Sequence, residues 1–299
     1  MGHDGERGRD TDITTPDGRT LRVRSAGPDD APVIVYCHGT PDSRPTIDIC
    51  ARLTTSSPVR LVALDRPGYG GSTPAPFGLA SVAVDTATVL DALGIGRFAV
   101  LGQSGGGPFA LACASVLGDR VAAVGVASGP GSFASVPGGA DLLDESDRAA
   151  MALVGIDDEA AARAFSAGFA PMAGLPDADD DTIRAAMHGL LPTDGAALAL
   201  PGVADGLVAV MREGLRQGTE GCGWDNVAWV GPWLLDLSTV RVPTWLWYGA
   251  EDPLAPPVHG EWLATQLPDA RLVVRPGEGH LGLYTHWDEM SATLTSRVV

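Results

Sequence analysis

A serine set among glycines is the residue of this sequence best suited to covalent chemistry. Residues 102–106 read G-Q-S-G-G, so Ser104 occupies the serine position of the pattern G-x-S-x-G. An apolar run, 98–101, precedes this segment, and a stretch of small residues that favours a helix follows it. A serine on so sharp a strand-to-helix turn is typical of a nucleophile elbow, because glycines leave room for its strained backbone and the helix N-terminus favours negative charge. We therefore expect Ser104 to attack a carbonyl carbon. The alternative, an incidental serine in a glycine-rich turn, fits this context less well.

A serine hydroxyl is a weak nucleophile, so a base must take its proton. We expect this base to be His280, at the end of a late apolar run. We expect Asp252 to accept the other ring N–H and so to fix the tautomer. The competing acid is Glu251, which adjoins Asp252 and also carries a carboxylate. The chain order Ser, Asp, His is one of those in which this catalytic triad occurs.

These residues all follow apolar runs that predict buried β-strands. The runs are 32–37, 60–64, 98–101, 121–127, 244–248 and 271–275. Segments with helical spacing alternate with them, at 45–56, 79–93, 107–114, 258–267 and 285–295. Two short strands, 12–15 and 20–25, flank a turn that contains Asp-Gly and predict an N-terminal hairpin. The alternation predicts an α/β fold with a mostly parallel sheet between helices, and functional groups collect at the carboxyl ends of such strands.

The strand–helix alternation stops near Phe133 and returns after Val240. Between these points the pattern is helical, with candidate helices at 140–154, 158–169, 180–191 and 198–217. A segment of this length is too long for a simple connection. We therefore expect a core domain formed by residues 1–132 and 241–299, and a helical cap at 133–240 whose apolar faces roof Ser104.

Several residues are candidates for the wall of a substrate pocket under this cap. Methionine and tryptophan side chains suit adaptable apolar pockets, and we expect a minority of those in the cap to face a cavity. Two further residues adjoin the candidate catalytic residues and are expected in the same wall. The candidate set is Gln103, Met151, Met172, Trp224, Trp229, Trp233 and Leu281.

Five short motifs together resemble the α/β-hydrolase fold superfamily, specifically its capped branch with a serine nucleophile. They are H-G at 38–39, D-R-P-G-Y-G-G-S at 65–72, G-Q-S-G-G at 102–106, G-A-E-D at 249–252 and G-E-G-H at 277–280. The resemblance spans almost the whole chain and implies an eight-stranded, mostly parallel sheet with the cap inserted after the sixth strand. It also implies that the backbone N–H groups of Thr40 and Gly105 form an oxyanion hole and that the triad acid is the last residue of G-A-E-D. By the same resemblance, His38 is a structural hydrogen-bonding residue.

Composition limits the partners that we expect. The 299-residue chain has a net charge of −17 and no lysine, so it should repel nucleic acid and anionic membrane surfaces. The N-terminal residues are too polar for a signal peptide, and no stretch is long and apolar enough to span a bilayer. The four cysteines lack the spacing of a metal site or a disulfide framework. We therefore expect a reduced, cytoplasmic protein with a small-molecule substrate and no metal or cofactor. A homodimer is compatible with the sequence.

The expected activity is that of a serine hydrolase that cleaves an ester or related acyl bond of a small to medium organic molecule through an acyl-enzyme. The same triad also serves carbon–carbon bond or amide hydrolysis and biosynthetic cyclase or thioesterase reactions, and these alternatives stay open. Epoxide hydrolases and haloalkane dehalogenases of this fold use an aspartate nucleophile, which Ser104 argues against. A non-catalytic protein that binds a small ligand is a further alternative, although such a protein would not need an oxyanion hole.

Overall fold

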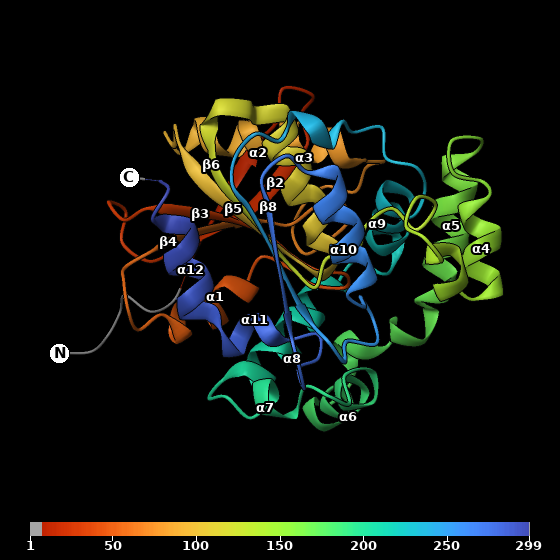
Figure 1. Cartoon of the computed structure of the whole chain (residues 1–299). Coiled ribbons are helices and arrows are strands. Elements are labelled where there is room, and N and C mark those ends of the chain that lie inside the picture. Colours follow the sequence, from red (N-terminus) through yellow and green to blue (C-terminus); the bar gives the residue numbers. More distant parts are fainter. Residues whose placement is uncertain (1–7, 299) are drawn as a thin grey trace.

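The fold is built around one eight-stranded sheet, which a computed structural model describes together with its helices for residues 8–298 (Figure 1). The strands are β1 (Arg9–Thr14), β2 (Thr20–Ala26), β3 (Val33–Cys37), β4 (Arg60–Leu64), β5 (Phe98–Gln103), β6 (Val121–Ala127), β7 (Thr244–Gly249) and β8 (Ala270–Arg275). Their order across the sheet is β1-β2-β4-β3-β5-β6-β7-β8. The pairs β1–β2 and β2–β4 are antiparallel, and the other neighbours are parallel. The prediction of an α/β fold with an eight-stranded, mostly parallel sheet is confirmed.

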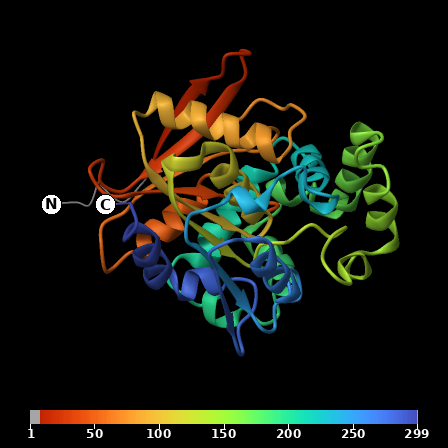
Figure 2. The same ribbon diagram turned by 45° about the horizontal axis from the view of Figure 1, so that its top comes forward.

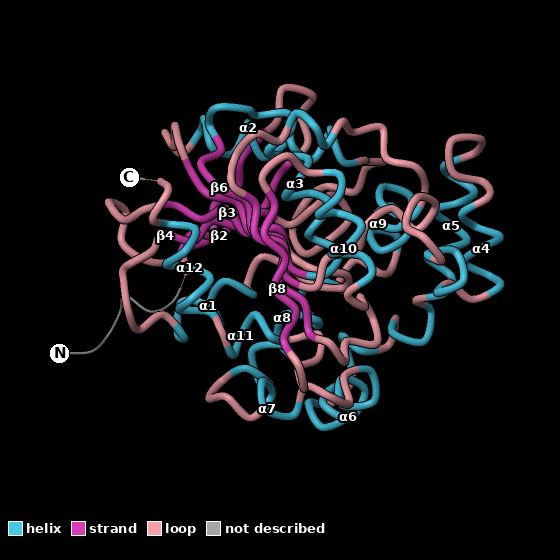
Figure 3. The backbone as a smooth tube through the Cα atoms, in the orientation of Figure 1, coloured by secondary structure: helices cyan, strands magenta, loops and turns pink. Residues whose placement is uncertain are grey.

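Helices cover both faces of the sheet (Figure 3). One face carries α1 (Thr46–Leu53), α11 (Gly282–Thr285) and α12 (Trp287–Thr295), and the other carries α2 (Leu79–Ala92), α3 (Gly107–Leu117) and α10 (Val258–Gln266). The central strands β3, β5 and β6 are buried along their whole length because both of their faces are covered. This burial explains why these strands are unbroken apolar runs in the sequence.

Six α-helices of the described chain lie between β6 and β7. They are α4 (Glu145–Met151), α5 (Asp158–Gly168), α6 (Asp180–Leu190), α7 (Gly195–Leu198), α8 (Val203–Gly214) and α9 (Glu220–Val230). They form two groups, since α4, α5 and α9 pack in succession, whereas α6 and α7 pack on α8, which in turn contacts α1. Figures 1 and 2 show α4 and α5, in green, at the side of the molecule away from the β1–β2 hairpin. None of the helices in the range 8–298 combines the length and the apolar composition needed to cross a bilayer.

Two of these helices differ from the sequence-based expectation. The helix expected at 198–217 is shorter, because α7 ends at Leu198 and a turn at Pro201 and Gly202, where φ of Gly202 is 77°, precedes the start of α8. Helix α9 was not expected, because Gly221 and Gly223 lower its intrinsic helix propensity. Its glycines instead allow close packing: a Cβ on Gly221 would lie 2.8 Å from the ring of Tyr69, and one on Gly223 would lie 2.2 Å from the carbonyl oxygen of Ala162. This packing brings α9 against the loop that follows β4.

Candidate active site

Strand β5 ends at Gln103, so Ser104 lies at the carboxyl edge of the sheet. A short 3-10 turn follows, and α3 begins at Gly107. The φ angle of Ser104 is 53°, in the left-handed region that residues other than glycine rarely adopt. Glycines make the turn sterically feasible, since a Cβ on Gly102 would lie 2.3 Å from the carbonyl oxygen of Gly106. The conformation of Ser104 therefore depends on its small neighbours.

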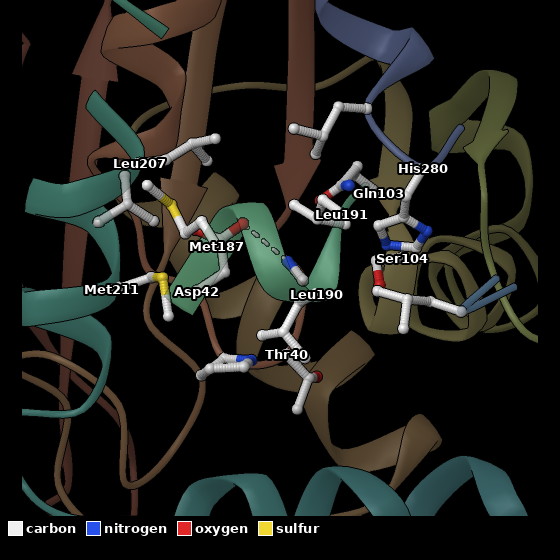
Figure 4. A pocket seen from close by; sticks show the side chains of 15 residues that line it. Thr40, Asp42, Gln103, Ser104, Met187, Leu190, Leu191, Leu207, Met211 and His280 are labelled. Atoms are coloured by element: carbon white, nitrogen blue, oxygen red, sulfur yellow. Dashed lines mark hydrogen bonds between the residues drawn. The ribbon is translucent and has the colours of Figure 1, made fainter. Parts of the chain in front are cut away.

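His280 follows β8, and its ring lies beside Ser104 in the wall of one cavity (Figure 4). The ring Nδ1 is 2.8 Å from Oδ2 and 3.0 Å from Oδ1 of Asp252, which follows β7. The backbone N–H groups of Leu254 and Ala255 donate hydrogen bonds of 2.9 and 3.0 Å to the same carboxylate. Of the two adjacent acids, Asp252 thus contacts the ring, whereas Glu251 is exposed at the surface.

The charge of Asp252 fixes the tautomer of His280. Burial on its own would raise the pKa of Asp252, but the hydrogen bond and charge of His280 and the two backbone donors together lower that pKa below its usual value. An ionised carboxylate can only accept hydrogen bonds, so Nδ1 of His280 must carry a proton. The lone pair of the neutral ring is then on Nε2, the nitrogen that can accept a proton from a nucleophile.

Gly105, which follows Ser104, lies against Thr40 in the cavity wall. A Cβ on Gly105 would lie 2.3 Å from Oγ1 and 3.5 Å from the amide nitrogen of Thr40, so the two segments are in close contact. Neither amide donates a hydrogen bond to another group within residues 8–298. Free N–H groups close to a serine hydroxyl are what an oxyanion hole requires. The role itself stays a prediction.

A buried ion pair holds the loop that carries Thr40. Arg66, which follows β4, donates hydrogen bonds of 2.7 and 2.6 Å to the two carboxylate oxygens of Asp225 on α9. The same guanidinium donates to the carbonyl oxygens of His38 at 2.6 Å and Gly39 at 2.8 Å. The Thr40 hydroxyl donates to Asp225 at 2.5 Å. Both ions are almost inaccessible to solvent, so removal of either would leave an unpaired buried charge.

His38 lies under this loop and uses both ring nitrogens. Its Nδ1–H donates to the carbonyl oxygen of Gly39 at 2.9 Å, and its Nε2 accepts the N–H of Arg66 at 3.2 Å. Burial, together with the charge of Arg66, holds the pKa of His38 well below its usual value. His38 is therefore neutral and fully engaged in hydrogen bonds, which makes it a support of the loop rather than a base.

A second carboxylate from the helices between β6 and β7 contacts the loop of His280. Asp194, just before α7, accepts the backbone N–H of His280 at 3.0 Å and that of Leu281 at 2.6 Å. The fit is close, since a Cβ on Gly279 would lie 2.5 Å from Oδ2 of Asp194. The inserted helices thus contribute one buried carboxylate to the loop of Thr40 and another to the loop of His280.

The cavity over Ser104 has a volume of about 110 Å³. Loops at the carboxyl ends of the strands supply its polar end, and α6, α8 and neighbouring residues supply an apolar wall (Figure 4). The lining residues are Gly39, Thr40, Pro41, Asp42, Gln103, Ser104, Met187, Leu190, Leu191, Leu207, Val210, Met211, Leu254, His280 and Leu281. Two predicted pocket residues, Gln103 and Leu281, are among them.

The prediction that five further residues line this pocket is wrong. These residues are Met151, Met172, Trp224, Trp229 and Trp233. Two of the tryptophans pack elsewhere: the ring centroids of Trp229 and Phe133 are 5.7 Å apart with the rings tilted, and those of Trp233 and Trp262 are 5.8 Å apart with the rings edge to face. Trp224 borders a separate hollow together with residues of α5. The reason is the division of the inserted helices into two groups, of which the group that contains α6 and α8 faces Ser104.

The sequence did not indicate the hydrogen bonds between residues that lie far apart along the chain. The ion pair of Arg66 with Asp225 joins residues 159 positions apart, and the contact of Asp194 with His280 spans 86 positions. Arg66 lies inside the motif D-R-P-G-Y-G-G-S, so the sequence marked it as a possible functional residue. Asp225 had none, because α9 itself was not predicted.

The matches to known proteins agree with this architecture. The model of the alpha/beta hydrolase fold family matches residues 32–286. The chain belongs to the α/β-hydrolase fold family. Among curated relatives, the bifunctional esterase/perhydrolase DCH of Acinetobacter calcoaceticus is 37% identical over 113 residues, which are 37% of this chain and 41% of the relative. A pimeloyl-[acyl-carrier protein] methyl ester esterase of Aromatoleum aromaticum is 40% identical over 62 residues, 21% of this chain and 25% of the relative. The chain thus matches less than half the length of either.

Solved structures of other α/β-hydrolases share the fold over nearly the whole chain. A hydrolase from Pseudomonas aeruginosa superposes with a TM-score of 0.67 at 22% identity, covering 96% of this chain and 97% of its own. An esterase from a Rhodococcus species has a TM-score of 0.64 at 19% identity, with 97% and 99% coverage. A thermophilic esterase from Thermogutta terrifontis has a TM-score of 0.67 at 20% identity, with 97% and 100% coverage. At such low identity these likenesses concern the fold alone.

Proposed function

We propose that this α/β-hydrolase is a serine esterase that cleaves an ester or related acyl bond of a small organic molecule through an acyl-enzyme. The observation that carries the proposal is the meeting of Ser104, at φ 53°, with the hydrogen-bonded pair of His280 and Asp252 in one cavity. The esterase names of the two curated relatives support the same class of reaction.

In this mechanism Ser104 Oγ attacks the substrate carbonyl carbon while Nε2 of His280 takes its proton. The Asp252 carboxylate stabilises the imidazolium that forms. The N–H groups of Thr40 and Gly105 bind the oxyanion, and each donor of this kind is worth roughly 3–4 kcal/mol of transition-state stabilisation. The tetrahedral intermediate collapses, and His280 gives the proton to the leaving alcohol. A water molecule then repeats the sequence on the acyl-enzyme and releases the acid.

We further infer that residues 133–240 form a cap that limits substrate size. The apolar side chains of α6 and α8 lie over the cavity, and apolar walls exclude water and favour apolar substrate groups. A cavity of about 110 Å³ suits short acyl or alcohol groups. Soluble short- to medium-chain esters should therefore be cleaved, whereas emulsified long-chain triglycerides and intact proteins should not.

The test is covalent labelling with a fluorophosphonate, followed by a hydrolysis screen over ester, thioester, amide and diketone panels. We expect the adduct on Ser104, ester turnover by the wild-type protein, and a loss of several orders of magnitude in turnover in Ser104→Ala. Ser128 is a control, because it also has a positive φ, of 50°, at the end of the neighbouring β6, but it is buried. Labelling of Ser128 or Ser72 would contradict the assignment. No labelling at all would favour a non-catalytic binding protein, and turnover of only diketones or amides would redefine the bond cleaved.

A further inference from the structure

The polar end of the cavity holds more hydrogen-bonding groups than ester hydrolysis requires. Three side chains converge on the small residue Gly39. A Cβ on Gly39 would lie 3.0 Å from Oε1 of Gln103, 3.4 Å from Cβ of Ser104 and 3.5 Å from Oδ2 of Asp42. The glycine therefore keeps open a space beside the nucleophile that a carboxamide and a carboxyl group border.

Gln103 has no partner for its side-chain amide. It is only 5% exposed and lines the cavity, yet no group within residues 8–298 forms a hydrogen bond with its amide. Its amide atoms are not among the fully buried unpaired polar atoms of residues 8–298, so they face the cavity, where a group that enters can complete their hydrogen bonds. Its position, one residue before Ser104 at the end of β5, points it into the space that a substrate must occupy.

Asp42 is fixed so that it presents an acceptor to the same space. Its Oδ2 accepts the N–H of Gly39 at 3.0 Å (Figure 4), and its Oδ1 accepts the N–H of Ser43 at 2.5 Å. Above pH 7, where Asp42 is ionised, each carboxylate oxygen can accept two hydrogen bonds, so both retain a free lone pair. The side chain is 5% exposed, and that remaining surface belongs to the cavity wall.

The rest of the cavity wall cannot satisfy these two groups. Opposite them lie apolar side chains of α6 and α8, among them Met187, Leu207 and Met211. A purely aliphatic substrate would cover the Gln103 amide without giving it a partner. A substrate hydroxyl would donate its one proton to Asp42 or to Oε1 of Gln103 and accept from Nε2 of Gln103, so it supplies partners for two of these three groups at once.

From this arrangement we propose that Gln103 and Asp42 form a subsite for a hydroxyl group carried one or two atoms from the scissile ester bond. The proposal rests on the proposed esterase function and narrows its substrates to hydroxy esters. A site built to hydrogen-bond a substrate hydroxyl rejects the analogue that lacks it, because its own polar groups are then buried unpaired. We expect a preference of at least about 10-fold in kcat/KM for a hydroxy ester over its methyl isostere.

The experiment compares two matched pairs of esters. Phenyl 2-hydroxybutanoate against phenyl 2-methylbutanoate places the hydroxyl on the acyl side, and 2-hydroxyethyl butanoate against propyl butanoate places it on the alcohol side. In the wild-type protein we expect one of the two pairs to show a higher kcat/KM for the hydroxy ester. In Gln103→Met we expect the ratio of the two kcat/KM values to fall toward one. Asp42→Asn provides a second variant, and Met187→Leu, which changes only the apolar wall, should keep the preference. Equal rates within both pairs in the wild-type protein would overturn the subsite while leaving the esterase function intact.

A binding measurement separates failure of the subsite from failure of the enzyme. The thermal shift of the wild-type protein is measured with 2-hydroxybutanamide and with 2-methylbutanamide, and again for Gln103→Met. If no ester were hydrolysed, a larger shift with the hydroxy amide, lost in Gln103→Met, would uphold the subsite and overturn only the esterase proposal. Equal shifts with the two amides would overturn the subsite.

Discussion

The floor and the roof of the cavity are built from different kinds of contact. The floor, made of Ser104, His280 and the loop of Thr40, comes from the ends of strands and is held by hydrogen bonds to buried groups. The roof, from α6 and α8, presents aliphatic and thioether side chains that are held by packing. Hydrogen bonds fix distances and angles, whereas apolar contacts tolerate changes of shape. The floor should therefore determine whether a reaction occurs, and the roof should determine which substrates react.

The division is not complete, because the inserted helices also reach the floor. Asp225 on α9 accepts hydrogen bonds from Arg66 and Thr40, and Asp194 accepts the backbone N–H of His280. The same insertion thus supplies an adaptable wall and two rigid anchors. Variants of the two kinds should behave differently.

The largest effect is expected at the floor, in Asp252→Asn. The neutral amide would keep the shape of the site but favour the wrong tautomer of His280, a change that costs about 10⁴-fold in kcat in a serine protease. Glu251→Gln is the matched control, since Glu251 is adjacent and exposed, and it should change kcat little. Steady-state kinetics of the two variants on one ester provide the measurement. A larger loss in Glu251→Gln would move the acid to that residue.

The next effect is expected where the insertion holds the floor, in Asp225→Asn. Arg66 would lose its counter-ion and the Thr40 hydroxyl would lose the carboxylate that accepts its hydrogen bond. The loop of Thr40 would therefore shift. A displacement of about 1 Å in such a group costs ~10²-fold in rate. We expect kcat to fall by that order while KM changes little, with a lower melting temperature.

Tyr69→Phe is the control for Asp225→Asn. It removes another hydrogen bond to the same carboxylate, of 2.5 Å, and keeps the ring that packs against His38 under the loop of Thr40. This variant should lose stability but keep most of its kcat. A loss of kcat in Tyr69→Phe equal to that in Asp225→Asn would indicate that the carboxylate acts only through general stability.

A smaller effect is expected at the roof, in Leu207→Ala and Met211→Ala. Both substitutions would enlarge the cavity by the volume of several methylene groups. One methylene group changes the ratio of kcat/KM between two substrates by about 10-fold or more only where the pocket encloses the substrate tightly. We expect the ratio of kcat/KM for octanoate over butanoate esters to rise by about 3–10-fold. Trp229→Ala, which truncates a residue outside the cavity, should lower the melting temperature and leave that ratio unchanged. An unchanged ratio in both roof variants would refute the assignment of the roof.

The smallest effect concerns the stability of the floor and its dependence on pH. Burial, which the N–H groups of Gly39 and Ser43 offset only in part, raises the pKa of Asp42 to about 7. The same carboxyl ionises near pH 4 in an unfolded chain, so between these values the folded state binds the extra proton and its stability falls as the pH rises. Asp42→Asn should therefore gain stability relative to the wild-type protein as the pH rises.

Melting temperatures of the two proteins at pH 5 and pH 8 measure this difference. We expect the variant to improve relative to the wild-type protein by about 5–10 °C over that range, because the two states differ by one proton over about two pH units, each worth ~1.4 kcal/mol. A difference independent of pH would show that Asp42 is ionised throughout.

The floor was more predictable from the sequence than the roof, for a physical reason. The elbow, the H-G turn and the ends of β7 and β8 are short contiguous motifs whose local backbone decides where their side chains lie. The roof depends on which helices pack over the cavity. Met151 on α4 and Met187 on α6 both lie in helical, partly apolar segments, but only Met187 lines the cavity. Which amphipathic face meets which surface is a property of the whole fold.

The anchors were not predictable at all. Asp225 lies in a segment whose glycines argue against a helix, and those glycines became favourable only because Tyr69 and Ala162 lie against them. Asp194 resembles any other acidic residue at a helix start until the fold brings the loop of His280 to it. Long-range hydrogen bonds of this kind leave no periodic pattern in the sequence.

The two anchors also restrict how this protein can be recombined with its relatives. Transplanting foreign helices between β6 and β7 is an obvious route to new specificity, since the junctions lie in loops. A donor segment without a carboxylate at the position of Asp225 would leave the buried Arg66 guanidinium without a counter-ion. A donor segment without a counterpart of Asp194 would remove the hydrogen bonds that hold the loop of His280. A working chimera must therefore inherit these two acids along with its new walls, so the segment is exchangeable only as a matched set.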